Sequence, residues 1–445
     1  MITVTLRISL VCPPRPRRTP EPGAPPRQSR LLAVLATVGL LLSGYASADG
    51  EPAAPAPRRA NWVGTWAAVP TATPATNTPA LDNQTIRQVI HTSVAGSELR
   101  LRLTNEFGTQ ALTIGEVHVA RRSGGAGTDI VAATDRTATF GGTRSPTIPA
   151  GAPLVSDPVR LPVPARSDLV VSIYVPTPTR VTTLHAFAST SNVIAAGNVA
   201  DDASVTGTTV GQWFFLSTVS VRADRDADAV VALGDSITNG AGTAADTNHR
   251  WPDRLANRLR DKGMLNLGVA GNRLLHDPNP PPGSNAQNFA VFFGESALRR
   301  FDRDVAAQPG VRYVIVLLGV NDLGHPGTVA PPSETVTAEE IIGAHRQLIT
   351  RAHADGLTIY GATILPFKDD TLGFYNEVNE AKRQAVNRWI RTSGEYDAVI
   401  DFDRVTRDPT DPLKLSPAYD SGDHLHPNDA GNAAMAAAIP ARLFH

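Results

Sequence analysis

Cysteine is almost missing from this chain, which has a single cysteine, Cys12, among 445 residues. Cys12 also falls within a segment that the features described below mark for removal. A mature chain without cysteine forms no disulfides, and thiol catalysis and cysteine-ligated metal sites are excluded for it.

A strong excess of charge of either sign is missing as well, since the chain has 41 Lys and Arg against 42 Asp and Glu. Removal of residues 1–48 would take away six basic residues and one acidic residue, which leaves 35 against 41 and a net charge of −6. A mildly acidic protein is poorly suited to nucleic-acid binding, so no nucleic-acid partner is expected.

The apolar run near the N-terminus is too short for a membrane anchor. It extends from Leu31 to Leu42, about 12 residues, whereas a helix needs about 20 to span a bilayer. Arginines precede it at positions 15, 17, 18, 27 and 30, and Ala46-Ser47-Ala48 follows as a small-residue cleavage site. This order predicts a secretory signal peptide over residues 1–48 and an exported, extracellular protein without a stable membrane anchor. The Pro- and Ala-rich residues 49–60 are then expected to form a linker.

Several common nucleotide-binding and catalytic motifs are also missing. Residues 234–240 lack the Gly-Lys-Ser/Thr of a phosphate-binding loop, and no Gly-x-Gly-x-x-Gly follows the apolar run before them. Thr238 stands where the Gly-x-Ser-x-Gly elbow of α/β-hydrolases needs its second glycine. These absences disfavour both nucleotide binding and that class of hydrolase.

Between residues 61 and 223 the apolar residues recur with a period of two. Residues 98–104 alternate apolar and polar, and 112–120, 169–175 and 213–221 are further strand candidates. This period is that of half-buried strands, and no helix of convincing length interrupts them. We therefore predict an antiparallel β-sandwich or jelly-roll domain over residues 61–223.

From residue 228 to residue 445, fully apolar runs alternate with amphipathic segments. The apolar runs predict strands at 229–233, 265–269, 311–318, 358–365 and 398–400, and helices are predicted at 251–260, 295–305, 341–354, 377–391 and 429–443. Strands that are apolar throughout are typical of a parallel sheet covered on both faces. Ligands of such sheets bind beyond the carboxyl ends of the strands.

Ser236, Gly271 and Asn321 follow the first, second and third of these strands, so they are expected at the same edge of the sheet. Ser236 suits a nucleophile that an adjacent base activates. The backbone N–H groups of Ser236 and Gly271 and the side-chain amide of Asn321 are candidate donors to an oxyanion. Each residue alone fits an ordinary turn equally well, but their shared position indicates a site.

Asp423 and His426 lie three residues apart before the last predicted helix. Asp423 is placed to fix the tautomer of His426, which would then act as general base and acid toward a serine. Two alternatives stay open. Asn428 or Asp429 could simply cap the helix, and Asp423, His424 and His426 could hold a metal, although no further His or Cys cluster completes a closed shell.

These four blocks together resemble the SGNH hydrolases, also called GDSL esterases and lipases. The matching residues are Gly234-Asp235-Ser236-Ile237, Gly271, Gly319-Val320-Asn321-Asp322 and Asp423-His424-Leu425-His426. The resemblance covers about residues 228–445 and implies a three-layer α/β/α, flavodoxin-like domain that hydrolyses carboxylic esters. It makes Ser236, Asp423 and His426 the catalytic residues and Ser236, Gly271 and Asn321 the oxyanion hole, with no metal and no cofactor. Residues 61–223 are more loosely similar to the accessory domain of secreted XynE-like members linked to plant cell-wall breakdown.

The long, proline-rich loop at 274–294 carries Phe289, Phe292 and Phe293 and is expected to form a pocket wall or a lid. His276 and His325 are expected to be ordinary loop residues.

The sequence thus predicts a secreted serine esterase for a small-molecule or polysaccharide ester, with deacetylation of a glycan slightly preferred. The alternatives are a lipase acting on lipid esters and a carbohydrate-binding protein with an inactive hydrolase domain. The motifs do not identify the acyl chain or the alcohol.

Overall fold

The structure is a computed structural model that describes residues 61–445. The predicted signal peptide (1–48) and linker (49–60), together with Cys12, lie outside the described residues and stay predictions. Within residues 61–445, no helix combines the length and the apolar character that crossing a membrane requires.

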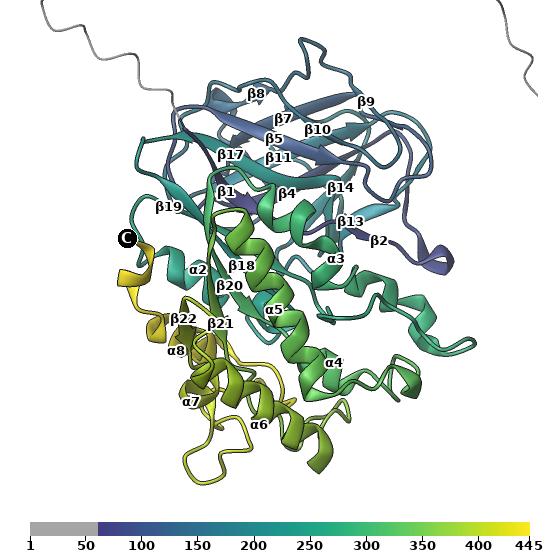
Figure 1. The fold of residues 1–445 in the computed structure, drawn as a ribbon. Coiled ribbons are helices and arrows are strands. Elements are labelled where there is room, and N and C mark those ends of the chain that lie inside the picture. Colours follow the sequence, from purple (N-terminus) through teal and green to yellow (C-terminus); the bar gives the residue numbers. More distant parts are fainter. Residues whose placement is uncertain (1–60) are drawn as a thin grey trace, which may run out of the picture. The chain divides into compact units, whose positions relative to one another are not determined.

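Residues 61–223, called the β-region below, are built almost entirely from strands (Figure 1). The strands are β1 (Asn61–Ala67), β2 (Thr71–Ala72), β3 (Ala80–Leu81), β4 (Gln84–His91), β5 (Leu99–Thr104), β6 (Leu112–Thr113), β7 (Glu116–Arg121), β8 (Arg136–Thr137), β9 (Thr147–Ile148), β10 (Pro153–Val155), β11 (Asp168–Val175), β12 (Thr179–Arg180), β13 (Thr183–His185), β14 (Asn192–Ala196), β15 (Thr208–Val210), β16 (Trp213–Phe214) and β17 (Leu216–Ala223). Two 3-10 helices, η1 (Ala75–Asn77) and η2 (Ala132–Thr134), interrupt them.

The two largest sheets of the β-region are antiparallel and sandwich-like, as predicted. One has the strand order β1-β17-β5-β10 and the other β15-β14-β4-β11-β7-β8. Strand β5 shows why the chain folds this way, because Leu99, Leu101 and Leu103 are fully buried while Arg100 and Arg102 between them are half-buried. Successive side chains of a strand point to opposite faces, so the leucines fill the core on one face of the sheet.

Two of the predicted strands are each divided into two shorter strands in the structure. Residues 112–120 divide into β6 and β7, because the chain bends at Gly115, where a side chain would meet the ring of Tyr174 at 2.5 Å. Residues 213–221 divide into β16 and β17 at Phe215, which has a φ of 57°. Neither break leaves a mark in the hydrophobic period.

Residues 228–445, called the α/β-region below, form the predicted three-layer fold. The strands are β18 (Asp228–Gly234), β19 (Lys262–Gly268), β20 (Val311–Leu317), β21 (Thr358–Ala362) and β22 (Ala398–Ile400). The helices are α1 (Ser236–Asn239), α2 (Trp251–Ala256), α3 (Ala297–Phe301), α4 (Val320–Gly324), α5 (Ala338–Ala354), α6 (Glu377–Thr392), α7 (Phe402–Thr406) and α8 (Asp429–Ala438). Shorter turns are η3 (Asn285–Asn288), η4 (Ala290–Phe293), η5 (Asp302–Ala306), η6 (Pro332–Glu334) and η7 (Ala441–Phe444).

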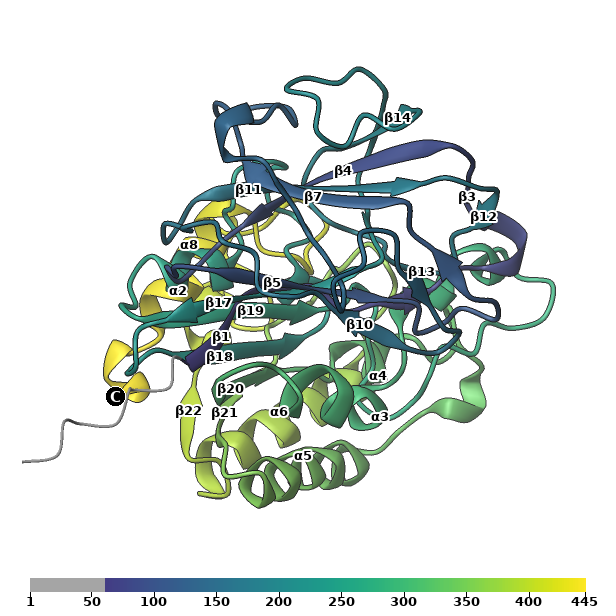
Figure 2. The same cartoon turned by 90° about the horizontal axis from the view of Figure 1, so that it is seen from above.

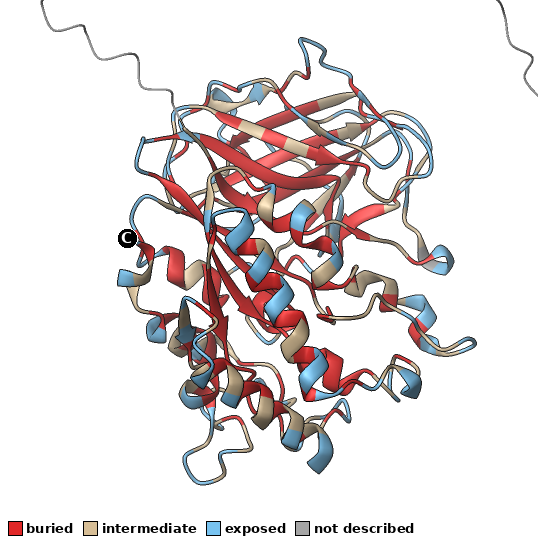
Figure 3. Cartoon of the chain, viewed as in Figure 1, coloured by how far each residue is buried: buried red, intermediate tan, exposed pale blue. Residues whose placement is uncertain are grey.

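The five strands of the α/β-region are parallel, in the order β19-β18-β20-β21-β22. Both faces of the sheet are covered, which explains why its strands are apolar throughout. Val231 and Leu233 of β18 share a core with α5 and α6, whereas Val230 and Ala232 share another with α2 and α8. Figure 3 shows the buried strands and the helix α5, whose exposed residues face outward.

The β-region packs directly on the edge of the parallel sheet. Strand β1 lies along β19, and Figures 1 and 2 both show β1 and β17 next to it. Gly64 and Gly263 permit this approach, since a side chain on Gly263 would meet the carbonyl oxygen of Gly64. The Ser93 hydroxyl accepts a hydrogen bond of 2.7 Å from the Met264 N–H, and one hydrophobic core continues across both regions.

Candidate active site

Ser236 lies at the turn where strand β18 passes into helix α1. The Asp235 carboxylate caps this helix by accepting a hydrogen bond of 3.0 Å from the Ile237 N–H. The turn is tight, because a side chain at Gly234 would meet Thr238 at 2.1 Å. Ser236 is therefore held at the carboxyl edge of the sheet, with 7% of its surface exposed.

His426 and Asp423 lie in the segment just before helix α8. His426 is hydrogen-bonded to Ser236 on one side and to Asp423 on the other. His426 Nε2 lies 2.8 Å from Ser236 Oγ, and His426 Nδ1 lies 2.5 Å from Asp423 Oδ2. The other oxygen of Asp423 accepts the backbone N–H groups of Leu425 at 3.0 Å and His426 at 2.8 Å. Asp423 thus has both of its oxygens bound within its own turn, which fixes the direction of the imidazole.

Hydrogen bonds from His426 stabilise the negative charge of Asp423. Partial burial alone would raise the pKa of Asp423, but the hydrogen bonds from the ring and the backbone of His426 outweigh it and lower that pKa well below its ordinary value. The carboxylate is therefore ionised at neutral pH.

The cap of helix α8, which the sequence left as an alternative to a catalytic role for this segment, is present together with the Asp423–His426 pair. Asn428 caps helix α8 by accepting a hydrogen bond of 2.9 Å from Gly431, so neither Asp423 nor His426 is needed for the cap. His424 points elsewhere and pairs with Asp420.

Gly271 and Asn321 reach the same cavity as Ser236 and His426. Gly271 has a φ of 74°, and a side chain there would meet the ring of Phe293 at 2.3 Å, so only glycine fits. Asn321 lies in α4 and donates one amide hydrogen to the Asn272 carbonyl at 3.0 Å, which fixes its orientation. Within residues 61–445, the backbone N–H groups of Ser236 and Gly271 have no acceptor, so they are available to a ligand.

Comparison with known proteins places these residues in a family. Residues 232–434, just under half of the chain, match the model of the GDSL-like Lipase/Acylhydrolase family. The α/β-region is thus similar to the GDSL-like hydrolases over these residues. It is a carboxylic ester hydrolase, as the sequence predicts. No curated protein matches the chain.

Among the solved structures similar to this chain is an aryl esterase from M. smegmatis, at 17% identity over 48% of this chain and 96% of that one, with a TM-score of 0.36. A GDSL-like lipase from Bacteroides thetaiotaomicron is 18% identical over 48% of this chain and 85% of that one, with a TM-score of 0.34. A carbohydrate esterase family 2 enzyme plus carbohydrate-binding domain from Corynascus thermopiles (Myceliophthora fergusii) is 14% identical over 86% of this chain and 97% of that one, with a TM-score of 0.37.

Sequence reasoning missed a buried arginine, Arg300, that holds the edge of the sheet together in this hydrolase. Its guanidinium donates to the carbonyls of Gly234 at 3.2 Å and Leu267 at 3.1 Å, and to Asn272 Oδ1 at 2.9 Å. These are the ends of β18 and β19, directly before Ser236 and Gly271. Burial lowers the pKa of Arg300 to about 10, which still leaves it charged at neutral pH. Nothing in the amphipathic pattern around Arg300 marks it as buried.

Sequence reasoning also missed the part of the β-region that reaches the site. His185 of β13 donates from Nδ1 to the Val69 carbonyl at 2.9 Å and lies 3.0 Å from Asn239 Nδ2, at the end of the helix that begins with Ser236. Burial lowers the pKa of His185 to about 4, so the ring is neutral and its Nε2 accepts the amide hydrogen. Asp246 accepts two hydrogen bonds of 2.6 Å from Ser191, which ties the next loop of the β-region to the α/β-region.

The cavity beside Ser236 has a volume of about 450 Å³. Phe289 and Phe293 line it, which confirms the predicted pocket wall, whereas Phe292 packs edge-to-face against Phe187 of the β-region. His325 follows α4 as expected but is no ordinary loop residue, because its ring is buried in the cavity wall between Phe293 and Phe374. Burial lowers the pKa of His325 to about 3, so it brings no charge to the wall.

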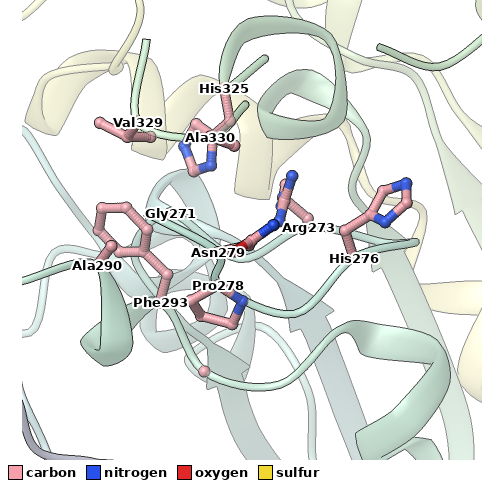
Figure 4. A pocket seen from close by; sticks show the side chains of 11 residues that line it. Gly271, Arg273, His276, Pro278, Asn279, Ala290, Phe293, His325, Val329 and Ala330 are labelled. Atoms are coloured by element: carbon pink, nitrogen blue, oxygen red, sulfur yellow. The ribbon is translucent and has the colours of Figure 1, made fainter. Parts of the chain in front are cut away.

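A second, much smaller pocket shares Gly271, Phe293, His325 and Val329 with this cavity (Figure 4). Its volume of about 10 Å³ is enough for about one water molecule, so it is not a substrate site. Arg273 lies beside it and forms an ion pair of 2.5 Å with Glu334, and His276 stands at its edge.

Two buried carboxyl groups support the site without facing the cavity. Burial raises the pKa of Asp235 to about 7. Burial also raises the pKa of Asp322, although its oxygens accept the backbone N–H groups of Leu274 at 2.8 Å and Leu275 at 2.9 Å. Asp322 thus fixes the start of the 274–294 loop at the end of α4.

Proposed function

We propose that this hydrolase is a secreted serine esterase that cleaves carboxylic esters through an acyl-enzyme formed on Ser236. The observation that carries the proposal is the unbroken hydrogen-bond chain from Asp423 through His426 to Ser236 Oγ. A serine hydroxyl is a weak nucleophile near neutral pH, and this arrangement gives it a base and orients that base.

In the first half of the reaction, Ser236 Oγ attacks the ester carbonyl carbon while His426 Nε2 takes the hydroxyl proton. Asp423 holds the proton on His426 Nδ1 and stabilises the imidazolium that forms. The negative carbonyl oxygen is met by the N–H groups of Ser236 and Gly271 and by the amide of Asn321, and each such donor contributes about 3 to 4 kcal/mol. His426 then protonates the alcohol, which leaves.

In the second half, His426 takes a proton from water, and the hydroxide attacks the acyl carbon. The tetrahedral intermediate collapses, the acid departs, and Ser236 Oγ regains its proton from His426. Every step uses groups of this chain, so the proposal requires neither a metal nor an organic cofactor.

Secretion and the nature of the ester are parts of the proposal that rest on the sequence. The predicted signal peptide supports export, and the resemblance of the β-region to that of XynE-like members supports a glycan ester. A test of the glycan prediction is release of acetate from acetylated xylan. A carbohydrate-binding protein with an inactive hydrolase domain would release none.

Mutation of the nucleophile tests the central step. Ser236→Ala should lower kcat for p-nitrophenyl acetate by several orders of magnitude, because members of a triad act as a unit. Ser189→Ala is the matched control, since Ser189 lines the same cavity without a hydrogen bond to His426, and it should stay close to the wild type. Unchanged turnover in Ser236→Ala would refute the proposal.

A further inference from the structure

The walls of the cavity beside Ser236 carry few polar side chains that could form hydrogen bonds with the hydroxyl groups of a sugar. None of the residues that line it is Asp, Glu, Lys or Arg. Apart from the reacting groups, its polar side chains are Ser189, Asn239, Thr328 and His325. Asn239 already lies in hydrogen-bonding distance of His185, and Thr328 already donates to the carbonyls of Gly324 and His325. A polyhydroxylated group would lose more hydrogen bonds to water than this wall returns.

The rest of the cavity wall consists mainly of apolar side chains, most of them large. It includes six hydrophobic side chains, Phe187, Phe289, Phe293, Val329, Leu372 and Phe374. The volume of about 450 Å³ is within the range of pockets for drug-sized ligands, so an acetyl group would leave most of it unfilled. The neutral ring of His325, whose centroid lies 5.2 Å from that of Phe293 with the two planes tilted by 35°, continues this surface.

Two exposed hydrophobic residues flank the mouth of the same cavity. Phe187 is 45% exposed and belongs to the loop between β13 and β14, whereas Leu372 is 49% exposed and belongs to the loop between β21 and α6. They are two of the six exposed large hydrophobic residues among the described residues, and one comes from each region. Exposed apolar surface that gathers at a cavity marks a ligand-binding site.

We propose that this cavity binds an apolar acyl chain, with Phe187 and Leu372 flanking the chain at the mouth. The inference rests on the proposed esterase function, and it selects a fatty-acyl ester over the acetylated glycan that the sequence prefers. The acyl group stays bound to Ser236 through both halves of the reaction, while the alcohol must leave and water must enter. A cavity directly beside Ser236 therefore serves the acyl part, and the substrate is an ester of a fatty acid of medium length.

A series of p-nitrophenyl esters from acetate to decanoate tests the proposal on the full chain. The value of kcat/KM should rise by up to about fourfold per methylene until the cavity is filled, because each buried methylene contributes that much to binding. A series of acetate esters with alcohols of increasing length should show a much weaker rise.

Phe187→Ala identifies the residue that recognises the chain. It should lower kcat/KM about tenfold more for the octanoate than for the acetate, since the ring covers several methylenes. Val155→Ala is the control, because Val155 is also half-exposed in the β-region and does not line the cavity. The control should leave both substrates unchanged.

The outcomes separate this inference from the proposed function. A profile that is flat or falls beyond acetate, a stronger dependence on the alcohol than on the acid, or faster turnover of acetylated xylan than of the octanoate would each overturn it. In those cases Ser236→Ala would still abolish activity. If Ser236→Ala stays active, the proposed function itself is wrong.

Discussion

The two regions of the molecule hold similar histidine–carboxylate pairs that differ in what the second ring nitrogen meets. In the β-region, His91 lies 2.6 Å from Asp168 and His118 lies 2.7 Å from Asp135. In the α/β-region, His426 lies 2.5 Å from Asp423 and also 2.8 Å from Ser236 Oγ. The histidine–carboxylate pair alone is a common structural feature, and the chemistry that we propose depends on the serine at the far nitrogen of His426.

A second contrast lies in how each region contributes to the site. The α/β-region supplies all the groups for which we propose a catalytic role: Ser236, Gly271 and Asn321 follow parallel strands, whereas Asp423 and His426 lie before helix α8. The β-region supplies none of them, but it contributes Phe187 and Ser189 to the cavity and His185 to the support of helix α1. The chemistry of the site therefore belongs to one region, while its shape belongs to both.

Separation of the two regions should have the largest effect. Residues 228–445 expressed alone should lack a cooperative unfolding transition and should not hydrolyse p-nitrophenyl acetate, because the core and the cavity wall are shared. Circular dichroism and a small-ester assay measure both properties, with residues 61–445 as the control. A fragment that folds cooperatively and is active would break the comparison.

The next largest effect is expected from the carboxylates of the histidine pairs. Asp423→Asn should lower kcat by a factor on the order of 10⁴, because the amide favours the wrong tautomer of His426. Asp135→Asn makes the same change beside His118, where no serine is involved, and should leave kcat unchanged. Steady-state kinetics on one small ester compares the two, and equal losses would contradict the account.

Two buried arginines, one in each region, test whether only the α/β-region affects catalysis. Arg87 in the β-region and Arg300 in the α/β-region are both fully buried and bind backbone carbonyls. Replacement of either by Met should lower the free energy of unfolding by about 3 to 5 kcal/mol, because buried polar groups are left without partners. Only Arg300→Met should also lower kcat, since only Arg300 holds the strand ends beside Ser236. Urea unfolding and kinetics on the folded fraction measure the two effects, and a kcat loss in both variants would contradict this assignment.

The smallest effect concerns the hydrogen bond between the regions. A double-mutant cycle of His185→Ala and Asn239→Ala should give a coupling free energy of about 1 kcal/mol, as for a neutral buried hydrogen bond. Urea unfolding of the two single variants and the double variant gives this value. Purely additive losses would show that the contact does not link the regions.

The sequence was sufficient where a short motif carries both the backbone geometry and the chemistry. The continuous apolar run of β18 and its alternation with helical segments predicted a parallel sheet with Ser236 at its edge, and Gly271 and Asn321 follow the next two strands of the chain. Asp423 and His426 are only three residues apart, so their contact was within reach of local reasoning.

The sequence was insufficient where contacts depend on packing between distant segments. Arg300 sits in an ordinary helical pattern, and only the approach of β18 and β19 buries it. His185 of β13 and Phe187 of the loop after it precede Ser236 by about 50 residues, so nothing in their neighbourhood indicated the active site. For the same reason the burial of the loop residue His325 in the cavity wall was not predicted.

The central claim is that Ser236 is the nucleophile and that His426 activates it. Diethyl p-nitrophenyl phosphate phosphorylates activated serines, and mass spectrometry of the digested protein locates the adduct. The account predicts one diethyl phosphate group on Ser236, activity lost in proportion to labelling, and no labelling of His426→Ala. An adduct on another residue, or full activity in protein labelled at Ser236, would contradict it.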